Sequence, residues 1–157
     1  MSYVSKPNRW LSVTCGEETF KLVEVVQPIL IVEDEALIRM GLADCLQSGG
    51  FAAAECSGGD EAMSYIDNAP QLQGLITDIR LGTGPNGWEV ARHARRKFAN
   101  LPVVYLTGDS AADWTVEGVP GSVLLQKPYA DVQMLTAMSN LLIEAGPLPP
   151  ATEPAPN

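Results

Sequence analysis

The sequence of 157 residues has no apolar run long enough to span a bilayer, so we expect no membrane-spanning helix. Its first residues also lack the apolar stretch and the small-residue cleavage site of a signal peptide. Basic residues are few, 10 against 19 acidic ones, and the net charge of −9 disfavours nucleic acid and anionic membranes as partners. Proteins, metal cations or small molecules fit this charge better.

Cysteine is scarce as well. The three cysteines, Cys15, Cys45 and Cys56, show no metal-binding spacing and cannot all pair with one another. A cytoplasmic location, where thiols stay reduced, is the simplest context for them. We expect Cys45 and Cys56 to be inert core residues because both lie in apolar segments, whereas Cys15 lies outside the expected domain.

The composition predicts one packed domain, since 46% of the residues are hydrophobic and 18% are charged. We expect this domain to cover residues 28–146. An N-terminal extension, residues 1–27, precedes it, and its β-branched content favours a strand at Thr19–Val26. A proline-rich tail, residues 147–157, follows the domain and is expected to be extended or disordered.

Within the domain, short apolar runs alternate with segments of helical periodicity. Such runs indicate strands that are buried on both faces. The expected strands are residues 29–32, 51–56, 74–77, 103–106 and 123–126, and the expected helices are residues 38–46, 57–68, 88–98, 110–117 and 132–145. The alternation predicts an α/β fold, a (βα)5 doubly wound sheet of five parallel strands with helices on both faces.

Three details of the expected helices are specific. Ser57 is a residue type that caps helices, and we expect it to cap the second one. The fourth helix is expected to be short, because Gly118 and Pro120 end it. The residues expected on the apolar face of the last helix are Val132, Leu135, Met138, Leu142 and Ala145.

Polar side chains follow four of the expected strands. Glu33 and Asp34 follow the first strand, and Asp78 follows the third. Thr107 follows the fourth strand, and Lys127 follows the fifth. In doubly wound sheets ligands bind beyond the carboxyl ends of the strands, so these residues form the candidate site.

This set of side chains fits phosphoryl transfer. Three carboxylates at one edge repel one another unless a cation joins them, and carboxylate oxygens suit Mg²⁺. The hydroxyl of Thr107 and the charge of Lys127 suit phosphate oxygens. A carboxylate can itself attack phosphorus to give an aspartyl phosphate, and the set contains no His or Cys nucleophile.

A glycine-rich loop after the third strand favours a competing interpretation. Gly82, Gly84 and Gly87 match the spacing of a dinucleotide-binding loop, and Asp109 lies about where a ribose-binding acid would lie. The loop follows the third strand, however, contains Pro85 and leaves too little chain for a full dinucleotide fold. A flexible active-site loop is therefore the interpretation that we favour.

Four motifs resemble the signatures of the response-regulator receiver family, in the order in which that family has them. They are Ile-Val-Glu-Asp-Glu (31–35), Thr-Asp-Ile-Arg-Leu (77–81), Val-Val-Tyr-Leu-Thr-Gly (103–108) and Gln-Lys-Pro-Tyr (126–129). Any one of them is a weak signal, but four in order at strand ends are a strong one. The resemblance covers residues 28–146 and implies the flavodoxin-like receiver fold.

The resemblance also implies a role for each site residue. It makes Asp78 the phosphoacceptor, and it makes Thr107 and Lys127 the residues that bind phosphoryl oxygens. The Mg²⁺ ligands that it implies are Glu33, Asp34, Asp78 and the backbone carbonyl of Arg80. The phosphoryl donor would be the phosphohistidine of a sensor histidine kinase or of a histidine phosphotransfer protein.

The sequence departs from the family pattern in three places. Leu124 stands where many receivers have an aromatic switch residue, the fourth helix is short, and the proline after the phosphoacceptor is displaced to Pro85. The sequence of residues 126–129 and the glycine loop resemble those of a receiver branch that is often encoded beside alphaproteobacterial sensor kinases.

The function that this resemblance implies is signalling rather than enzymatic turnover. A stand-alone receiver would act on a downstream protein through contacts, or would serve as a phosphoryl shuttle or sink; a homodimer is left open. The alternative is an interaction module that keeps the receiver fold and works without phosphorylation. A small hydrolase is a weaker third option, because no dedicated general base is evident.

Other features of the chain keep more than one interpretation. Residues 1–27 fit a sheet-edge or dimer arm, a kinase-docking segment, or sequence upstream of the true start. The basic run Arg92 to Lys97 favours solvated charges that complement the helix dipole, with docking to an acidic partner as the alternative. Trp88 and Trp114 fit either the core or a partner contact.

Overall fold

Five parallel strands form one sheet in the order β2-β1-β3-β4-β5. The structure is a computed structural model, and it describes residues 27–109 and 111–147. The strands are β1 Ile29–Val32, β2 Ala53–Cys56, β3 Gly74–Asp78, β4 Val103–Thr107 and β5 Val123–Gln126. The expected strand at Thr19–Val26 lies outside the described residues, as do Cys15 and most of both terminal segments.

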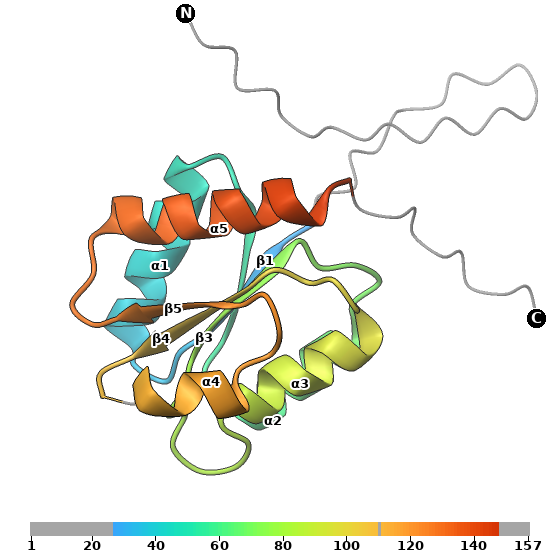
Figure 1. Cartoon of the computed structure of the whole chain (residues 1–157), viewed down its shortest axis with the longest axis vertical. Helices are drawn as coiled ribbons and strands as arrows, with labels where there is room; N and C mark the ends of the chain where they lie inside the picture. Colours follow the sequence, from blue (N-terminus) through green and yellow to red (C-terminus); the bar gives the residue numbers. More distant parts are fainter. Residues whose placement is uncertain (1–26, 110, 148–157) are drawn as a thin grey trace, which may run out of the picture.

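Helices cover both faces of this sheet. In the described residues they are α1 Ala36–Ser48, α2 Gly59–Asn68, α3 Gly87–Lys97, α4 Trp114–Glu117 and α5 Asp131–Ala145, and a 3-10 turn η1, Ala111–Asp113, precedes α4. Figure 1 shows α1 and α5 on one side of the sheet and α2 and α3 on the other. The predicted (βα)5 doubly wound sheet and the short fourth helix are confirmed. Among the described helices, none is both long and apolar enough to cross a membrane.

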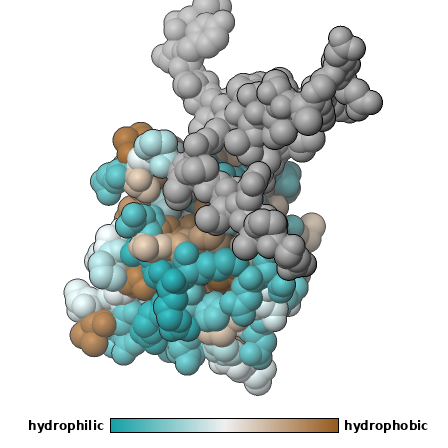
Figure 2. Space-filling model, turned by 90° about the vertical axis from the view of Figure 1, so that its right-hand side faces the viewer, coloured by the Kyte–Doolittle hydropathy of each residue, from teal (hydrophilic) through white to brown (hydrophobic). Residues whose placement is uncertain are grey.

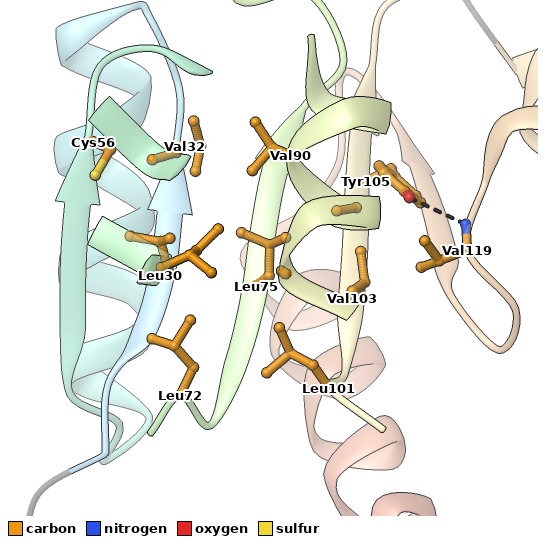
Figure 3. Packing of buried hydrophobic residues seen from close by; sticks show 14 of the residues in the cluster. Leu30, Val32, Cys56, Leu72, Leu75, Val90, Leu101, Val103, Tyr105 and Val119 are labelled. Atoms are coloured by element: carbon orange, nitrogen blue, oxygen red, sulfur yellow. Dashed lines mark hydrogen bonds between the residues drawn. The ribbon is translucent and has the colours of Figure 1, made fainter. Parts of the chain in front are cut away.

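The core has two layers because the central strands are covered on both faces. Along β1, Leu30 and Val32 point toward α2 and α3, whereas Ile29 and Ile31 point toward α1 and α5. All four side chains are fully buried. Figure 3 shows the first of these layers. Continuous apolar runs at β1, β3 and β4 therefore mark strands that bury both faces, as predicted.

The surface carries fewer apolar side chains than the core. On the face in Figure 2, hydrophilic side chains cover much of the coloured surface, and apolar ones are exposed between them in small patches. The large hydrophobic residues that are exposed in the described part of the chain are Leu37, Met40, Val116, Val132 and Ile143.

Ser57 does not cap α2, contrary to the prediction. The N-cap residue is Gly58, and the N–H and hydroxyl of Ser57 both donate to the carboxylate of Glu61, at 2.7 and 2.9 Å. The side chain of Ser57 binds forward to the first turn of the helix instead of accepting from a backbone N–H. Ser57 lies one residue before the N-cap because α2 begins at Gly59, and its two donors bind the carboxylate of Glu61, which the prediction left out.

The buried face of α5 also differs from the prediction. Its fully or nearly buried residues are Met134, Met138 and Leu141, whereas Val132 is 66% exposed. Apolar residues occur nearly all round this helix, so periodicity alone does not determine which face meets the sheet. Of the predicted residues, Met138 is fully buried, and Leu135 and Leu142 are partly buried and pack against the same core layer.

The first residue of α3 lies directly against the backbone of the residue that ends β3. A Cβ atom on Gly87 would overlap the carbonyl oxygen of Asp78. The N–H of Gly87 donates to the carbonyl of Ile79 at 2.9 Å, which closes the loop between β3 and α3. Gly82 and Gly84 within this loop have positive φ angles of 75° and 85°. The loop therefore needs glycine at its end for space and within it for conformation.

Replacing Gly87 by alanine is expected to destabilise the protein, because the overlap is with backbone that cannot rotate away. We expect Gly87→Ala to lower the free energy of unfolding by about 2–3 kcal/mol. Gly41→Ala is the matched control: Gly41 lies within α1 and a Cβ there meets nothing within 4 Å. It is expected to raise stability by about 0.5–1 kcal/mol. Urea denaturation measures both, and equal stability of the two variants would contradict the packing described here.

Candidate functional site

The strands end at a common level along one edge of the sheet. Val32, the last residue of β1, pairs with Thr77 of β3, and Thr107, the last residue of β4, pairs with Gln126 of β5. The residues that follow these pairs leave the sheet side by side. This edge includes the boundary between β1 and β3, where the strand order reverses and where doubly wound sheets bind ligands.

Three carboxylates meet at this edge. Glu33 and Asp34 follow β1, Asp78 ends β3, and each offers an oxygen within 4.8 Å of the others. Glu33 is fully buried and Asp78 is 8% exposed, whereas Asp34 is exposed. The cluster is therefore open to solvent on the side of Asp34.

Lys127 joins two of these carboxylates. Its Nζ atom donates to Oδ2 of Asp78 at 2.8 Å and to Oε2 of Glu33 at 3.2 Å. The lysine is placed by its backbone, because its N–H donates to the carbonyl of Thr107 at 2.7 Å, directly beyond the last pair of the β4–β5 ladder. The predicted strand-end residues Glu33, Asp78 and Lys127 are thus in direct contact.

Backbone N–H groups orient the side-chain oxygens of the site. The N–H of Arg80 donates to Oδ1 of Asp78 at 3.2 Å, and the N–H of Glu35 donates to Oε1 of Glu33 at 3.1 Å. The N–H of Asp109 donates to the hydroxyl oxygen of Thr107 at 3.2 Å. Each of these oxygens is therefore held by a donor two residues further along the chain.

The electrostatics of the site favour a divalent cation. Burial raises the pKa of Glu33 to about 7, and the charge of Asp78 adds to this effect against the opposing N–H of Glu35 and charge of Lys127. Burial alone would lower the pKa of Lys127, but its hydrogen bond to Asp78 and the charges of both carboxylates raise it. When all three carboxylates are ionised, they and Lys127 together carry a net charge of −2.

This donor set fits Mg²⁺. The ion prefers hard oxygen ligands and keeps several waters, and the exposed side of the cluster leaves room for them. A charge of +2 also offsets the −2 of the cluster and would lower the pKa of Glu33 again. Whether the carbonyl of Arg80 joins the ligands stays a prediction; the N–H of the same residue already contacts Asp78.

Two arginine side chains at this edge form contacts that were not predicted. The guanidinium of Arg39 donates to the carbonyl oxygen of Glu33 at 2.7 Å and lies 3.7 Å from the carboxylate of Glu55. Arg80 forms an ion pair with Asp109 at 2.9 Å across the edge. The spacing of Arg80 from Asp78 and of Asp109 from Thr107 is the signal in the sequence that places both charges beside the site.

The tryptophans and the basic run on α3 lie in internal contacts. Trp88 is buried against Tyr105, with ring centroids 4.5 Å apart, and Trp114 donates to the hydroxyl of Ser122 at 3.0 Å. Arg92 pairs with Glu117 at 2.9 Å. These side chains connect α3, β4 and α4.

Lys97 also binds within the molecule. Its Nζ atom donates to the carbonyls of Ile66, Asp67 and Ala69, at 2.9, 2.7 and 2.8 Å. These carbonyls lie at the end of α2. Arg92, Arg96 and Lys97 are exposed, as expected for solvated charges. Arg92 and Lys97 also connect α3 to α4 and α2.

Comparisons with known proteins agree with the fold. Residues 29–139 match the family of response regulator receiver domains. The crystal structure of a response regulator receiver protein from Sinorhizobium medicae is 36% identical with a TM-score of 0.75, and the match covers 77% of this chain and 98% of that one. The phosphate regulon transcriptional regulatory protein PhoB of Pseudomonas aeruginosa is 30% identical, over 78% of this chain and 55% of its own length.

The chain spans about half the length of the transcriptional regulators that it matches. A match of 25% identity also covers 73% of this chain and 12% of the sensor kinase CckA of Brucella abortus. The similarity is therefore to one part of several larger proteins.

The raised pKa of Glu33 predicts how the stability of the metal-free protein depends on pH. This pKa is about 7 in the folded state, against an ordinary value of 4.5. Between pH 4.5 and about 7 the folded protein keeps a proton on Glu33 that the unfolded chain has lost. The stabilisation of the folded state by this proton is therefore fully present below pH 4.5 and is lost as the pH rises through about 7. We expect the free energy of unfolding in EDTA to fall over this range by about 1–3 kcal/mol because of Glu33.

Glu33→Gln should remove that part of the pH dependence, because glutamine does not ionise. Glu144→Gln, at an exposed position on α5, should leave it in place. Denaturation at several pH values with EDTA measures the difference between the variants. The same slope in Glu33→Gln and in the unaltered protein would contradict the assignment.

Proposed function

The chain belongs to the response regulator receiver family, and we propose that it accepts a phosphoryl group on Asp78 and signals through protein contacts. Receiver domains are signalling domains of two-component systems, and they interact with histidine kinases and downstream targets. The observation that carries the proposal is the contact of Lys127 with Asp78 and Glu33 beside a third carboxylate. This contact supports the proposal because phosphoryl transfer needs a carboxylate that can accept the group, carboxylates that can bind a cation and an amine that can bind phosphate, and such groups lie together here.

For the transfer step the chain supplies the acceptor, and a donor protein supplies the phosphoryl group. A carboxylate oxygen of Asp78 attacks the phosphorus of a phosphohistidine on a sensor kinase or a histidine phosphotransfer protein. A P–O bond forms to Asp78, the P–N bond breaks, and its electron pair returns to the imidazole of the donor. The product is an aspartyl phosphate and an unmodified histidine.

Lys127 and Thr107 bind the transferred group in this proposal. The lysine exchanges its bond to Asp78 for bonds to phosphoryl oxygens, which carry more charge than a carboxylate. Thr107 is 2% exposed and its hydroxyl is held by the N–H of Asp109, so the hydroxyl is oriented before the phosphoryl group arrives. Both side chains therefore stabilise the charge of the product and of the transition state.

Receiver domains bind Mg²⁺ at an acidic site, and Glu33, Asp34 and Asp78 would hold it here, with the carbonyl of Arg80. When bound, the ion supplies positive charge that offsets the charge on the phosphoryl oxygens. The chain's own contribution is to bury Glu33 and Asp78 at a distance at which two carboxylates repel, so that a cation is favoured there.

The output of the domain is part of the proposal. We assign the receiver to residues 28–146, with contact to a protein target or relay of the phosphoryl group as its output. The net charge of −9 favours protein partners over nucleic acid. We propose that the transfer of the phosphoryl group takes place in the cytoplasm, where thiols such as those of Cys45 and Cys56 stay reduced.

One observation favours a second function, an interaction module that works without phosphorylation. Leu124 stands at the position where the resemblance implies an aromatic switch residue, and it packs half-buried against the core layer that contains Tyr105. An aliphatic side chain packed in this way offers no ring to rotate with Thr107. Partner affinity that is the same before and after phosphorylation would favour this second function.

Phosphorylation by a small-molecule donor tests the main proposal. Incubation with acetyl phosphate and Mg²⁺ should add the mass of one phosphoryl group to the intact protein, and Asp78→Asn should abolish the addition because an amide does not attack phosphorus. Asp44→Asn, an exposed position on α1, is the matched control and should react as the unaltered chain does. Intact-mass spectrometry measures both, and labelling that persists in Asp78→Asn would remove the proposal.

A further inference from the structure

An ion pair spans the edge of the sheet above the acceptor. Nη2 of Arg80 lies 2.9 Å from Oδ2 of Asp109, and the two residues are 29 positions apart in the chain. Arg80 follows Asp78 by two residues, and Asp109 follows Thr107 by the same spacing. The pair therefore links the loop that follows β3 to the segment that follows β4.

Backbone contacts hold both members of the pair close to the site. The N–H of Arg80 donates to Oδ1 of Asp78, and the N–H of Asp109 donates to the hydroxyl of Thr107. The main chain of Arg80 is thus within hydrogen-bond distance of the acceptor carboxylate. Its long side chain starts there and reaches outward to Asp109, so a phosphoryl group on Asp78 lies within its range.

The ion pair is weak enough to be exchanged. The side chain of Arg80 is 75% exposed and that of Asp109 is 60% exposed. Solvent and salt screen a pair of this kind strongly. A phosphoryl group on Asp78 brings more negative charge than a carboxylate and three acceptor oxygens, and guanidinium binds such a group through two parallel hydrogen bonds.

We propose that Arg80 exchanges Asp109 for the phosphoryl group when Asp78 is phosphorylated. In this assignment Arg80 is a phosphoryl-binding side chain in addition to Lys127, and Asp109 is a competitor that retains the guanidinium in the unmodified protein. The inference rests on the proposed function and deepens it, since it concerns residues that set the affinity of the same site.

The exchange also links the site to the surface beyond β4. Asp109 lies two residues before the start of η1, which leads into α4, the helix that carries Trp114 and Glu117. Loss of the ion pair removes one side-chain contact between this segment and the β3–α3 loop. The contacts that remain, Arg92 with Glu117 and Trp114 with Ser122, tie the segment to α3 and to the start of β5.

Binding of a phosphoryl mimic tests the exchange at equilibrium. Beryllium fluoride with saturating Mg²⁺ is titrated into the full chain, and isothermal titration calorimetry gives its affinity. Arg80→Gln should weaken binding by about three- to tenfold, because it removes a charged ligand but keeps the backbone groups. Asp109→Asn should strengthen binding by about two- to fivefold, because it removes the competitor.

The double variant separates exchange from a general effect of charge. If Asp109 acts by holding Arg80, Asp109→Asn has no effect once Arg80 is glutamine, and the double variant binds as Arg80→Gln does. If Asp109 only repels the incoming anion, its removal strengthens binding by the same factor in both backgrounds. That additive result would overturn the inference, as would unchanged affinity in Arg80→Gln.

Arg92 and Glu117 provide matched controls, because they form an exposed ion pair of the same 2.9 Å length away from the site. Arg92→Gln and Glu117→Gln carry the same charge changes and should bind beryllium fluoride as the unaltered chain does. An equal loss in Arg80→Gln and Arg92→Gln would show a general field effect and would overturn the inference. Failure of the unaltered chain to bind the mimic would overturn the proposed function itself, and the exchange with it.

Discussion

Lys127 contacts two carboxylates at once, Asp78 at 2.8 Å and Glu33 at 3.2 Å. Without a positive charge at that point, two buried acids at neighbouring strand ends would repel each other and one would take up a proton. Burial raises the pKa of Glu33 to about 7 and the charge of Asp78 adds to this effect, so the charge of Lys127 does not offset the two together. The fold thus maintains a local excess of negative charge, which favours the binding of a further cation at this site.

The parallel sheet explains why so much of this site was predictable. In such a sheet the carboxyl ends of all strands lie at the same edge. The sequence alone therefore predicts that the residues at the ends of β1, β3, β4 and β5 lie close together. Glu33, Asp78 and Lys127 were placed by this rule and are in contact. The roles of these residues in binding and transfer stay predictions, because geometry alone does not show a reaction.

Other features depend on contacts that periodicity does not encode. Ser57 was expected to cap α2, but the helix begins at Gly59, and the N–H and hydroxyl of Ser57 donate to the carboxylate of Glu61. The predicted face of α5 was right at Met138, Leu135 and Leu142, which pack against the core. It was wrong at Val132, which is exposed, because apolar residues surround much of that helix and periodicity does not select one face. The pairing of Arg80 with Asp109 joins two loops whose separation in space follows only from the finished sheet.

A crystal structure with Mg²⁺ and beryllium fluoride tests the central claim most directly, since it locates the ion, the acceptor and the lysine together. The account predicts beryllium bonded to a carboxylate oxygen of Asp78, Mg²⁺ held by Glu33, Asp34 and Asp78, and the amine of Lys127 on a fluoride. An ion bound elsewhere, or a lysine still placed between Glu33 and an unmodified Asp78, would contradict the account.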